Sequence, residues 1–332
     1  MAPTVFLDGR FLERDDARVS AFDAGLQHAV GLFETMTAIG TPDGPRVFRL
    51  WHHLDRLTTS ARELGLTESL ELEALGEAAA ETVRRSGLCD QPGARARVRL
   101  TITGGDLNLL QSEGRSVARA TILIQIQPAT AYPEAMFERG ITAGVADLRV
   151  NPFDPTQGHK TLNYWPRLRE LQRASARHAA EALVFQVTNH LAGGAVSNAF
   201  VVRDGVMMTP IARGEERDVA EALGAGPGAP PRVAGAGGGH AAMPSPVLPG
   251  VTRGVVLAAA RAQGLKVERR MLTIDDVFAA DEVFLTNSSW GVLPVVRVEQ
   301  HMIATGEVGE VTRALRGAWV RAAAGEDDDA EG

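Results

Sequence analysis

A change of apolar periodicity within the first 130 residues is the feature that most constrains the fold of this chain. The stretch WHHLDRLTTSARELGL spaces its apolar residues by three and four, which predicts an amphipathic helix built on Leu54, Leu57, Ala61 and Leu64. The stretches ARVRLTIT and TILIQIQ alternate apolar and polar residues instead. This pattern predicts two strands with one buried face each, on Val98, Leu100 and Ile102 and on Ile122, Ile124 and Ile126.

The length and the loop composition predict two domains. A chain of 332 residues is long enough for about two domains of ordinary size. The prolines of PATAYPEA end the alternating pattern, so we expect a first domain over 1–127, a connection over 128–135 and a second domain over 136–322. Further strands are expected in ALVFQV, NAFVVRDG and DEVFLT. Segment 214–245, rich in Gly, Pro and Ala, is expected to be a flexible insertion, and the acidic residues 323–332 a disordered tail.

Composition argues against several classes of function. The net charge of -7 argues against a general nucleic-acid surface. The start of the chain has no signal pattern, and no apolar run approaches the roughly 20 residues that span a bilayer, so no membrane contact is expected. The single cysteine, Cys89, indicates a reducing compartment, which we take to be the cytoplasm. The scattered histidines lack the spacing of metal ligands, so no metal site is expected.

Lysine is rare in this chain and therefore informative. Only Lys160, in GHKTLNYW, and Lys266, in GLKVERR, stand among 34 Lys and Arg residues. Arginine keeps its proton in proteins, whereas lysine can lose it and attack a carbonyl carbon. A solvated surface cation is the ordinary interpretation of any lysine, and we apply it to Lys266. Lys160 is the candidate for amine chemistry.

Three motifs are candidate anion sites, although each has an ordinary structural interpretation. LPGVTRG places Val251 and Thr252 at the start of an apolar helix, where free N–H groups favour a phosphate. LTNSSWGVLPV follows a strand with polar residues that include Ser288. Arg56 lies on the predicted early helix and is either an anion ligand or a salt-bridged surface residue.

Together these motifs resemble the class IV pyridoxal-phosphate enzymes of fold type IV, a family that includes branched-chain aminotransferase, D-amino acid aminotransferase and aminodeoxychorismate lyase. The resemblance runs in order over almost the whole chain, through VFLDGRFL, VSAFDAGLQHAVGLFETM, HLDRLTTSARELGL, GHKTLNYWPRL, SNAFVVRDGVMMTPI, LPGVTRGVV and LTNSSWGVLPV. It implies an α/β (α+β) fold of two domains, with a small α/β domain and a larger domain built around a β-barrel-like core. It also implies a homodimer.

The resemblance implies roles for individual residues. Lys160 would form a Schiff base with pyridoxal 5'-phosphate and then move the proton at the substrate's α-carbon. The phosphate would be held by Arg56, the N–H groups of Val251 and Thr252, and the hydroxyls of Thr252 and Ser288. Asn163 and Tyr164 would line the cofactor pocket, and Glu34 is interpreted as structural.

Two departures from the family pattern affect the expected site. An aromatic residue near the substrate carboxylate is replaced by His28. The glutamate that bonds to the pyridine nitrogen is replaced by Gly193, which cannot keep that nitrogen protonated.

The sequence leaves three functions open. Transamination between a small amino acid and a keto acid is favoured. A lyase that releases pyruvate, like aminodeoxychorismate lyase, is the second. A non-catalytic protein that binds the cofactor is the third, because of Gly193.

Overall fold

The computed structural model describes residues 4–67, 70–106, 119–224, 226–234 and 240–325 of the chain. It divides into two compact units, which are described separately. Unit 1 comprises Met1–Ala131, Lys160–Asn163 and Ala322–Gly332, and unit 2 comprises Tyr132–His159 and Tyr164–Arg321. The segment with Lys160 thus belongs to unit 1, although it lies within the range expected for the second domain. Most of the expected acidic tail, residues 326–332, lies outside the described residues.

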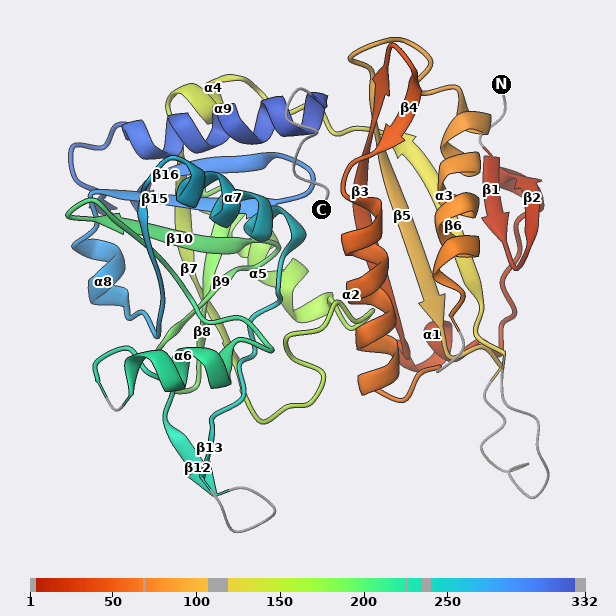
Figure 1. The fold of residues 1–332 in the computed structure, drawn as a ribbon. Helices are drawn as coiled ribbons and strands as arrows, with labels where there is room; N and C mark the ends of the chain where they lie inside the picture. Colours follow the sequence, from red (N-terminus) through yellow and green to blue (C-terminus); the bar gives the residue numbers. More distant parts are fainter. Residues whose placement is uncertain (1–3, 68–69, 107–118, 225, 235–239, 326–332) are drawn as a thin grey trace. The chain divides into compact units, whose positions relative to one another are not determined.

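Unit 1 is an antiparallel sheet covered by two helices (Figure 1). Its strand order is β2-β1-β6-β5-β3-β4, with β1 (Thr4–Leu7), β2 (Arg10–Glu13), β3 (Gly31–Thr41), β4 (Gly44–Val47), β5 (Arg95–Thr103) and β6 (Ile122–Pro128). The helices α2 (Leu50–Glu63) and α3 (Leu72–Ser86) pack against this sheet and against each other. A short 3-10 helix (Arg14–Asp16) and α1 (Ala24–His28) precede β3.

The core of unit 1 follows the apolar periods of the sequence. Leu54, Leu57 and Ala61 of α2 are at most 1% exposed, and they pack with the alternating residues of β5 and β6. Cys89 is buried in the same core, and its burial raises the pKa of its thiol. The predicted helix and both predicted strands of this half of the chain are confirmed.

Unit 2 is built on a curled mixed sheet. Its strand order is β14-β11-β10-β15-β16-β7-β8-β9, with β17 paired to β16. The strands are β7 (Ile141–Val150), β8 (Glu181–Gln186), β9 (Leu191–Gly194), β10 (Asn198–Arg203), β11 (Val206–Thr209), β14 (Lys266–Arg269), β15 (Glu282–Asn287), β16 (Gly291–Val298) and β17 (His301–Met302). Because β9, at one end of this order, also contacts β10, the sheet curls on itself. The expected fold class is confirmed.

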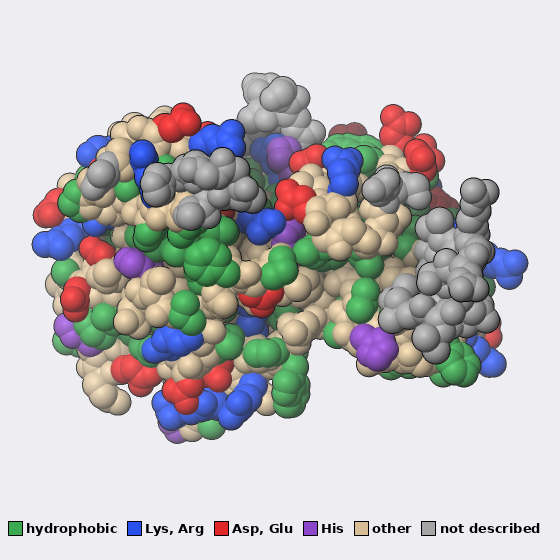
Figure 2. Space-filling view, turned by 90° about the horizontal axis from the view of Figure 1, so that it is seen from below, with side chains coloured by type: hydrophobic (Ala, Val, Ile, Leu, Met, Phe, Trp, Pro, Cys, Tyr) green, Lys and Arg blue, Asp and Glu red, His purple; other side chains and the backbone are tan. Residues whose placement is uncertain are grey.

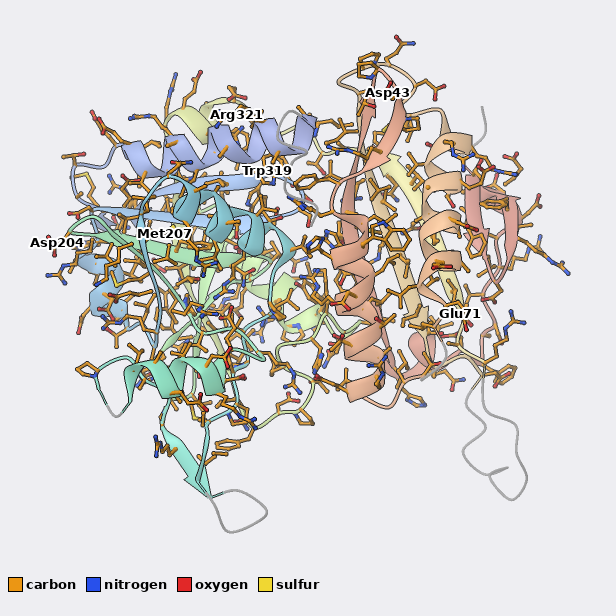
Figure 3. All side chains as sticks on the ribbon, in the orientation of Figure 1. Asp43, Glu71, Asp204, Met207, Trp319 and Arg321 are labelled. Atoms are coloured by element: carbon orange, nitrogen blue, oxygen red, sulfur yellow. The ribbon has the colours of Figure 1, made fainter. Side chains whose placement is uncertain are left out.

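Helices pack around this sheet. They are α4 (Ala135–Glu138), α5 (Trp165–Ala176), α6 (Glu216–Leu223), α7 (Val251–Ala262), α8 (Ile274–Phe278) and α9 (Glu310–Ala324). Figure 3 labels Trp319, a buried residue of α9 whose ring lies where Gly291 of β16 would carry a Cβ atom. Among the described residues, no helix is both long enough and apolar enough to cross a bilayer. On the face drawn in Figure 2, acidic and basic side chains are interspersed.

The segment expected to be a flexible insertion contains regular structure. Residues 214–245 include α6 and a hairpin of β12 (Arg232–Ala234) and β13 (His240–Ala242), while residues 225 and 235–239 lie outside the described part. Val219 of α6 and Met243 are buried in a small cluster with Ile211 and Met271. Part of the segment expected to be a flexible insertion therefore packs in a core. The sequence did not indicate this, because an eight-residue helix is too short to stand out among Gly and Pro residues.

Candidate functional site

A buried carboxylate in unit 1 binds two basic side chains. Arg56 donates from Nε to Glu34 Oε1 at 2.9 Å and from Nη2 to Glu34 Oε2 at 2.6 Å. His53, one helical turn before Arg56 on α2, lies with Nδ1 2.7 Å from Glu34 Oε2. Glu34 and His53 are 1% and 2% exposed, so this cluster is closed to water. The fork of Arg56 fits a carboxylate bidentately.

The charges within this cluster shift two pKa values. Burial raises the pKa of Glu34, but the Arg56 guanidinium and the His53 hydrogen bond outweigh it and lower the pKa to about 2. Burial lowers the pKa of His53, and the nearby positive charges of Arg56 and Lys160 lower it further. The hydrogen bond and the charge of Glu34 raise it, but the net shift is downward. Glu34 is therefore ionised and His53 neutral at pH 7, with the ring N–H at Nδ1 donated to the carboxylate.

Lys160 is held against β3 of unit 1. Phe33 N donates to Lys160 O at 2.9 Å, and Leu162 N donates to Gly31 O at 3.0 Å. Thr161 forms an isolated bridge with Leu32, and the Lys160 ammonium lies 4.3 Å from the centroid of the Phe33 ring. The backbone of Lys160 is thus fixed next to the strand that carries Glu34. This placement differs from that of Lys266, whose side chain is 69% exposed and pairs with Glu268.

The first turn of α7 in unit 2 provides unused backbone donors. The first hydrogen bond of the helix joins Gly254 N to Gly250 O at 2.9 Å, so the N–H groups of Val251, Thr252 and Arg253 have no acceptor within the helix. The cap residue Gly250 makes no side-chain cap, and Thr252 is 4% exposed. A helix start of this kind favours an anion.

Asn198 joins this helix start to the end of β15. Its Nδ2 donates to Leu248 O at 2.9 Å, and a Cβ atom at Gly250 would lie 2.0 Å from its Oδ1. In the sheet, Asn198 pairs with Thr286, whose buried Oγ1 has no hydrogen-bond partner among the described residues. Ser288, in the turn after β15, is partly buried. Through Asn198, unit 2 therefore connects the start of α7 at Val251 to the end of β15 before Ser288.

An ion pair that the sequence did not reveal connects the first turn of α7 to Glu215. Arg253 is 3% exposed and donates from Nη1 and Nη2 to the two carboxylate oxygens of Glu215, both at 2.8 Å. Burial raises the pKa of Glu215, but Arg253 outweighs it and lowers the pKa below its usual range. Glu215 lies in the segment that we expected to be a flexible insertion. That segment therefore anchors the first turn of α7.

Gly193 occupies a position that accepts no side chain. Its φ is +141°, and a Cβ atom there would lie 2.7 Å from Ser197 O. Glu181 of β8 is fully buried beside this loop and accepts hydrogen bonds from Ser197 Oγ at 2.9 Å and from the N–H groups of Ala182, Ala195 and Val196. Burial raises its pKa despite these donors. Glu181 anchors the loop that replaces the expected acid.

The remaining predicted residues are exposed or partly buried. His28 is exposed at the end of α1 in unit 1, and Asn163 is exposed at the end of the Lys160 segment. Tyr164 is partly buried and stands directly before α5 in unit 2. Lys160 and Arg56 thus belong to unit 1, whereas Tyr164, Val251, Thr252 and Ser288 belong to unit 2.

Comparison with known proteins gives consistent matches over nearly the entire chain. The family model of amino-transferase class IV matches residues 31–216 and 237–298. A relative from Methanocaldococcus jannaschii, named "Putative branched-chain-amino-acid aminotransferase", is 30% identical over 94% of this chain and 93% of its own length. The crystal structure of the Escherichia coli branched-chain amino acid aminotransferase matches with a TM-score of 0.82 at 25% identity, over 100% of this chain and 98% of that one.

Two further solved structures bear on the cofactor and on the reaction. The T.th. branched-chain amino acid aminotransferase, complexed with N-(5'-phosphopyridoxyl)-L-glutamate, matches with a TM-score of 0.77 at 25% identity over 98% of this chain and 95% of that one. The 4-amino-4-deoxychorismate lyase from Pseudomonas aeruginosa matches with a TM-score of 0.73 at 25% identity over 99% and 100%.

Proposed function

Because the chain belongs to the amino-transferase class IV family, we propose that it transfers an amino group between a small aliphatic amino acid and a 2-oxo acid, with Lys160 as the lysine that binds pyridoxal 5'-phosphate covalently. The aliphatic substrate is proposed from the names of the branched-chain relatives. The observation that carries the role of Lys160 is its fixed backbone: Lys160 O accepts a hydrogen bond from β3, whereas Lys266 lies in an exposed surface ion pair.

The residues of unit 2 fit the phosphate of this cofactor. The N–H groups of Val251 and Thr252 are unused within α7, and Gly250 leaves no side chain over them. Thr286, whose hydroxyl has no hydrogen-bond partner among the described residues, lies on the strand end that Asn198 shares with this turn and adds a donor. Ser288 is proposed as a further ligand. These neutral donors suit a bound phosphate, which helix N-termini bind through free N–H groups and the helix dipole.

Lys160 is proposed to carry the proton that leaves the substrate's α-carbon. Pyridoxal phosphate supplies the carbon that receives the amino group and a conjugated ring that stabilises charge. The Glu34, His53 and Arg56 cluster fixes β3 and α2 beside the Lys160 segment. Arg56 is proposed as a phosphate ligand from the family resemblance, and its guanidinium group suits a phosphate. Gly193 offers no acid to keep the pyridine nitrogen protonated, which weakens the ring as an electron sink. Removal of the α-proton is therefore proposed to rely more on Lys160 itself.

A half-reaction assay tests this function. The purified protein with bound pyridoxal phosphate is mixed with valine, leucine, isoleucine, alanine or glutamate, and the absorbance of the cofactor is followed. An aminotransferase converts the cofactor to its amine form, and a 2-oxo acid then restores it. Pyruvate release from aminodeoxychorismate, without conversion by any amino acid, would assign the lyase reaction instead. An unchanged spectrum with every amine would support a non-catalytic protein.

We also propose that the enzyme is a homodimer of the cytoplasm. The dimer is proposed from the family resemblance and from exposed apolar side chains of Phe153, Trp165 and Leu168, on both sides of the Lys160 segment in the chain. The cytoplasm is proposed from the single cysteine. Analytical ultracentrifugation tests the dimer: a monomer at micromolar concentration with full activity would contradict it.

A further inference from the structure

Unit 2 contains a cavity of about 340 Å³ that the proposed reaction does not use. It lies between the beginning of β7, the C-terminal half of α5 and the turn after β16. Its volume falls in the range of small-molecule sites. None of the residues proposed to hold the cofactor lines it, and the loop that leads to Lys160 leaves the opposite end of β7.

Small residues keep this cavity open. A Cβ atom at Gly144 would lie 3.5 Å from Glu299 Oε1 and 3.8 Å and 4.0 Å from the Cβ atoms of Ala174 and Ala179. These are ordinary contact distances, so the strand accepts a Cβ atom at Gly144 without displacing its neighbours. Ala182 completes the small residues of the lining. Larger side chains at these positions would occupy the space.

The acidic residues of the lining are already engaged by the protein. Glu170 Oε2 accepts from Asp147 N at 2.9 Å, and Glu299 Oε1 accepts from Val145 N at 2.7 Å. Arg173 is paired with Asp147 and lies 3.7 Å from Glu170 Oε1. These contacts fix the carboxylates and neutralise Arg173.

Two arginines of the lining have no partner among the described residues. The side chains of Arg177 and Arg297 form no hydrogen bond or ion pair with any described residue, and His178 adds a third nitrogen donor. When Asp147, the partner of Arg173, is counted with the two glutamates, three acids balance the three arginines. Guanidinium groups bind carboxylates bidentately, so Arg177 and Arg297 suit a carboxylate ligand.

We infer that this cavity binds a small molecule through its carboxylate, with Arg177 and Arg297 as ligands. Free amino acids and 2-oxo acids share this chemistry. In an amino acid the ammonium group would find the second oxygen of Glu299 as an acceptor. The inference stands on the cavity and does not depend on the proposed reaction.

Calorimetric titration of the holoenzyme after borohydride reduction tests the inference, because reduction removes turnover. Leucine, 2-oxoisocaproate and inorganic phosphate are titrated in turn. At least one of the two carboxylates, leucine or 2-oxoisocaproate, is expected to bind. The one that binds more tightly shows whether the natural ligand is an amino acid or a 2-oxo acid. Arg297→Gln and Arg177→Gln are each expected to weaken this binding about tenfold, since a hydrogen bond to a charged group is lost. The matched control Arg261→Gln, at an exposed arginine of α7, is expected to leave it unchanged.

Gly144→Val provides a second, independent variant, because it fills the cavity without removing a charge. It is expected to abolish the same binding while the thermal midpoint stays within a few degrees of the wild type. Binding that survives both arginine substitutions and Gly144→Val would overturn the inference. Binding of phosphate alone would overturn the assignment to a carboxylate.

Discussion

Arg56 and Glu34 form a two-point ion pair, with Nε 2.9 Å from Oε1 and Nη2 2.6 Å from Oε2. The pair joins α2 to β3, and His53 closes it from the same helix. Phe33, which precedes Glu34 in β3, donates its N–H to the backbone oxygen of Lys160 and so positions the proposed catalytic lysine. The stability of unit 1 and the geometry of Lys160 are therefore linked.

Glu34→Gln is expected to destabilise the protein by about 3 kcal/mol at pH 7, because it leaves the Arg56 charge without its partner in a buried cluster. Urea unfolding measures this loss. The matched control is Glu81→Gln, in an exposed ion pair with Arg85 on α3, which is expected to change stability much less. Equal losses in the two variants would show that the buried pair adds nothing beyond a surface one.

The same pair predicts a pH dependence with a defined sign. The pKa of Glu34 is lowered from 4.5 to about 2 in the folded protein, so its contribution is complete above pH 4.5 and is lost as the pH falls towards 2. The difference in unfolding free energy between wild type and Glu34→Gln should therefore shrink between pH 4.5 and pH 2. A difference that stays constant over this window would contradict the lowered pKa.

Glu215→Gln is expected to weaken pyridoxal phosphate binding, because Arg253 in the first turn of α7 loses its buried partner. We expect a stability loss of about 3 kcal/mol and a rise of the cofactor's dissociation constant of about tenfold. Fluorescence titration of the apoenzyme measures the second effect. Glu221→Gln, at an exposed residue of α6, is the control. Unchanged cofactor affinity in Glu215→Gln would refute the proposed link.

Gly193→Ala is expected to destabilise the protein by about 2 kcal/mol, since its φ of +141° and the nearby Ser197 O leave no room for a Cβ atom. Gly254→Ala, on α7 with open space around it, is expected to stabilise by roughly 0.5–1 kcal/mol. Thermal unfolding of both variants compares them. A harmless Gly193→Ala would mean that the backbone relaxes and that Gly193→Glu could restore an acid there.

The parts of the fold that the sequence predicted are those with a local signal. The spacing of Leu54, Leu57 and Ala61 is contained in one helix, and the alternation of β5 and β6 needs no distant partner. The start of α7 beside Thr252 was also predictable, because an apolar helix follows a Pro-Gly turn.

The missed features depend on partners far apart in the sequence. Thr161 bridges to Leu32, which assigns the Lys160 segment to unit 1, and no periodicity encodes such a pairing. Arg253 and Glu215 are separated by 38 residues, and their pairing has no periodic signal. The interpretation of Glu34 as structural agrees with its hydrogen bonds to His53 and Arg56. A basic pair three residues apart on α2 was the available signal for that cluster.

The central claim is that Lys160 is the lysine that binds the cofactor, and the chain's two lysines make it directly measurable. The holoenzyme and its Lys266→Arg and Lys160→Arg variants are reduced with borohydride, and the mass of each chain and of its peptides is determined. We predict one reduced cofactor on the Lys160 peptide of the wild type and of Lys266→Arg, and none on Lys160→Arg. A label on Lys266, or no label on wild-type protein that demonstrably holds pyridoxal phosphate, would contradict the account.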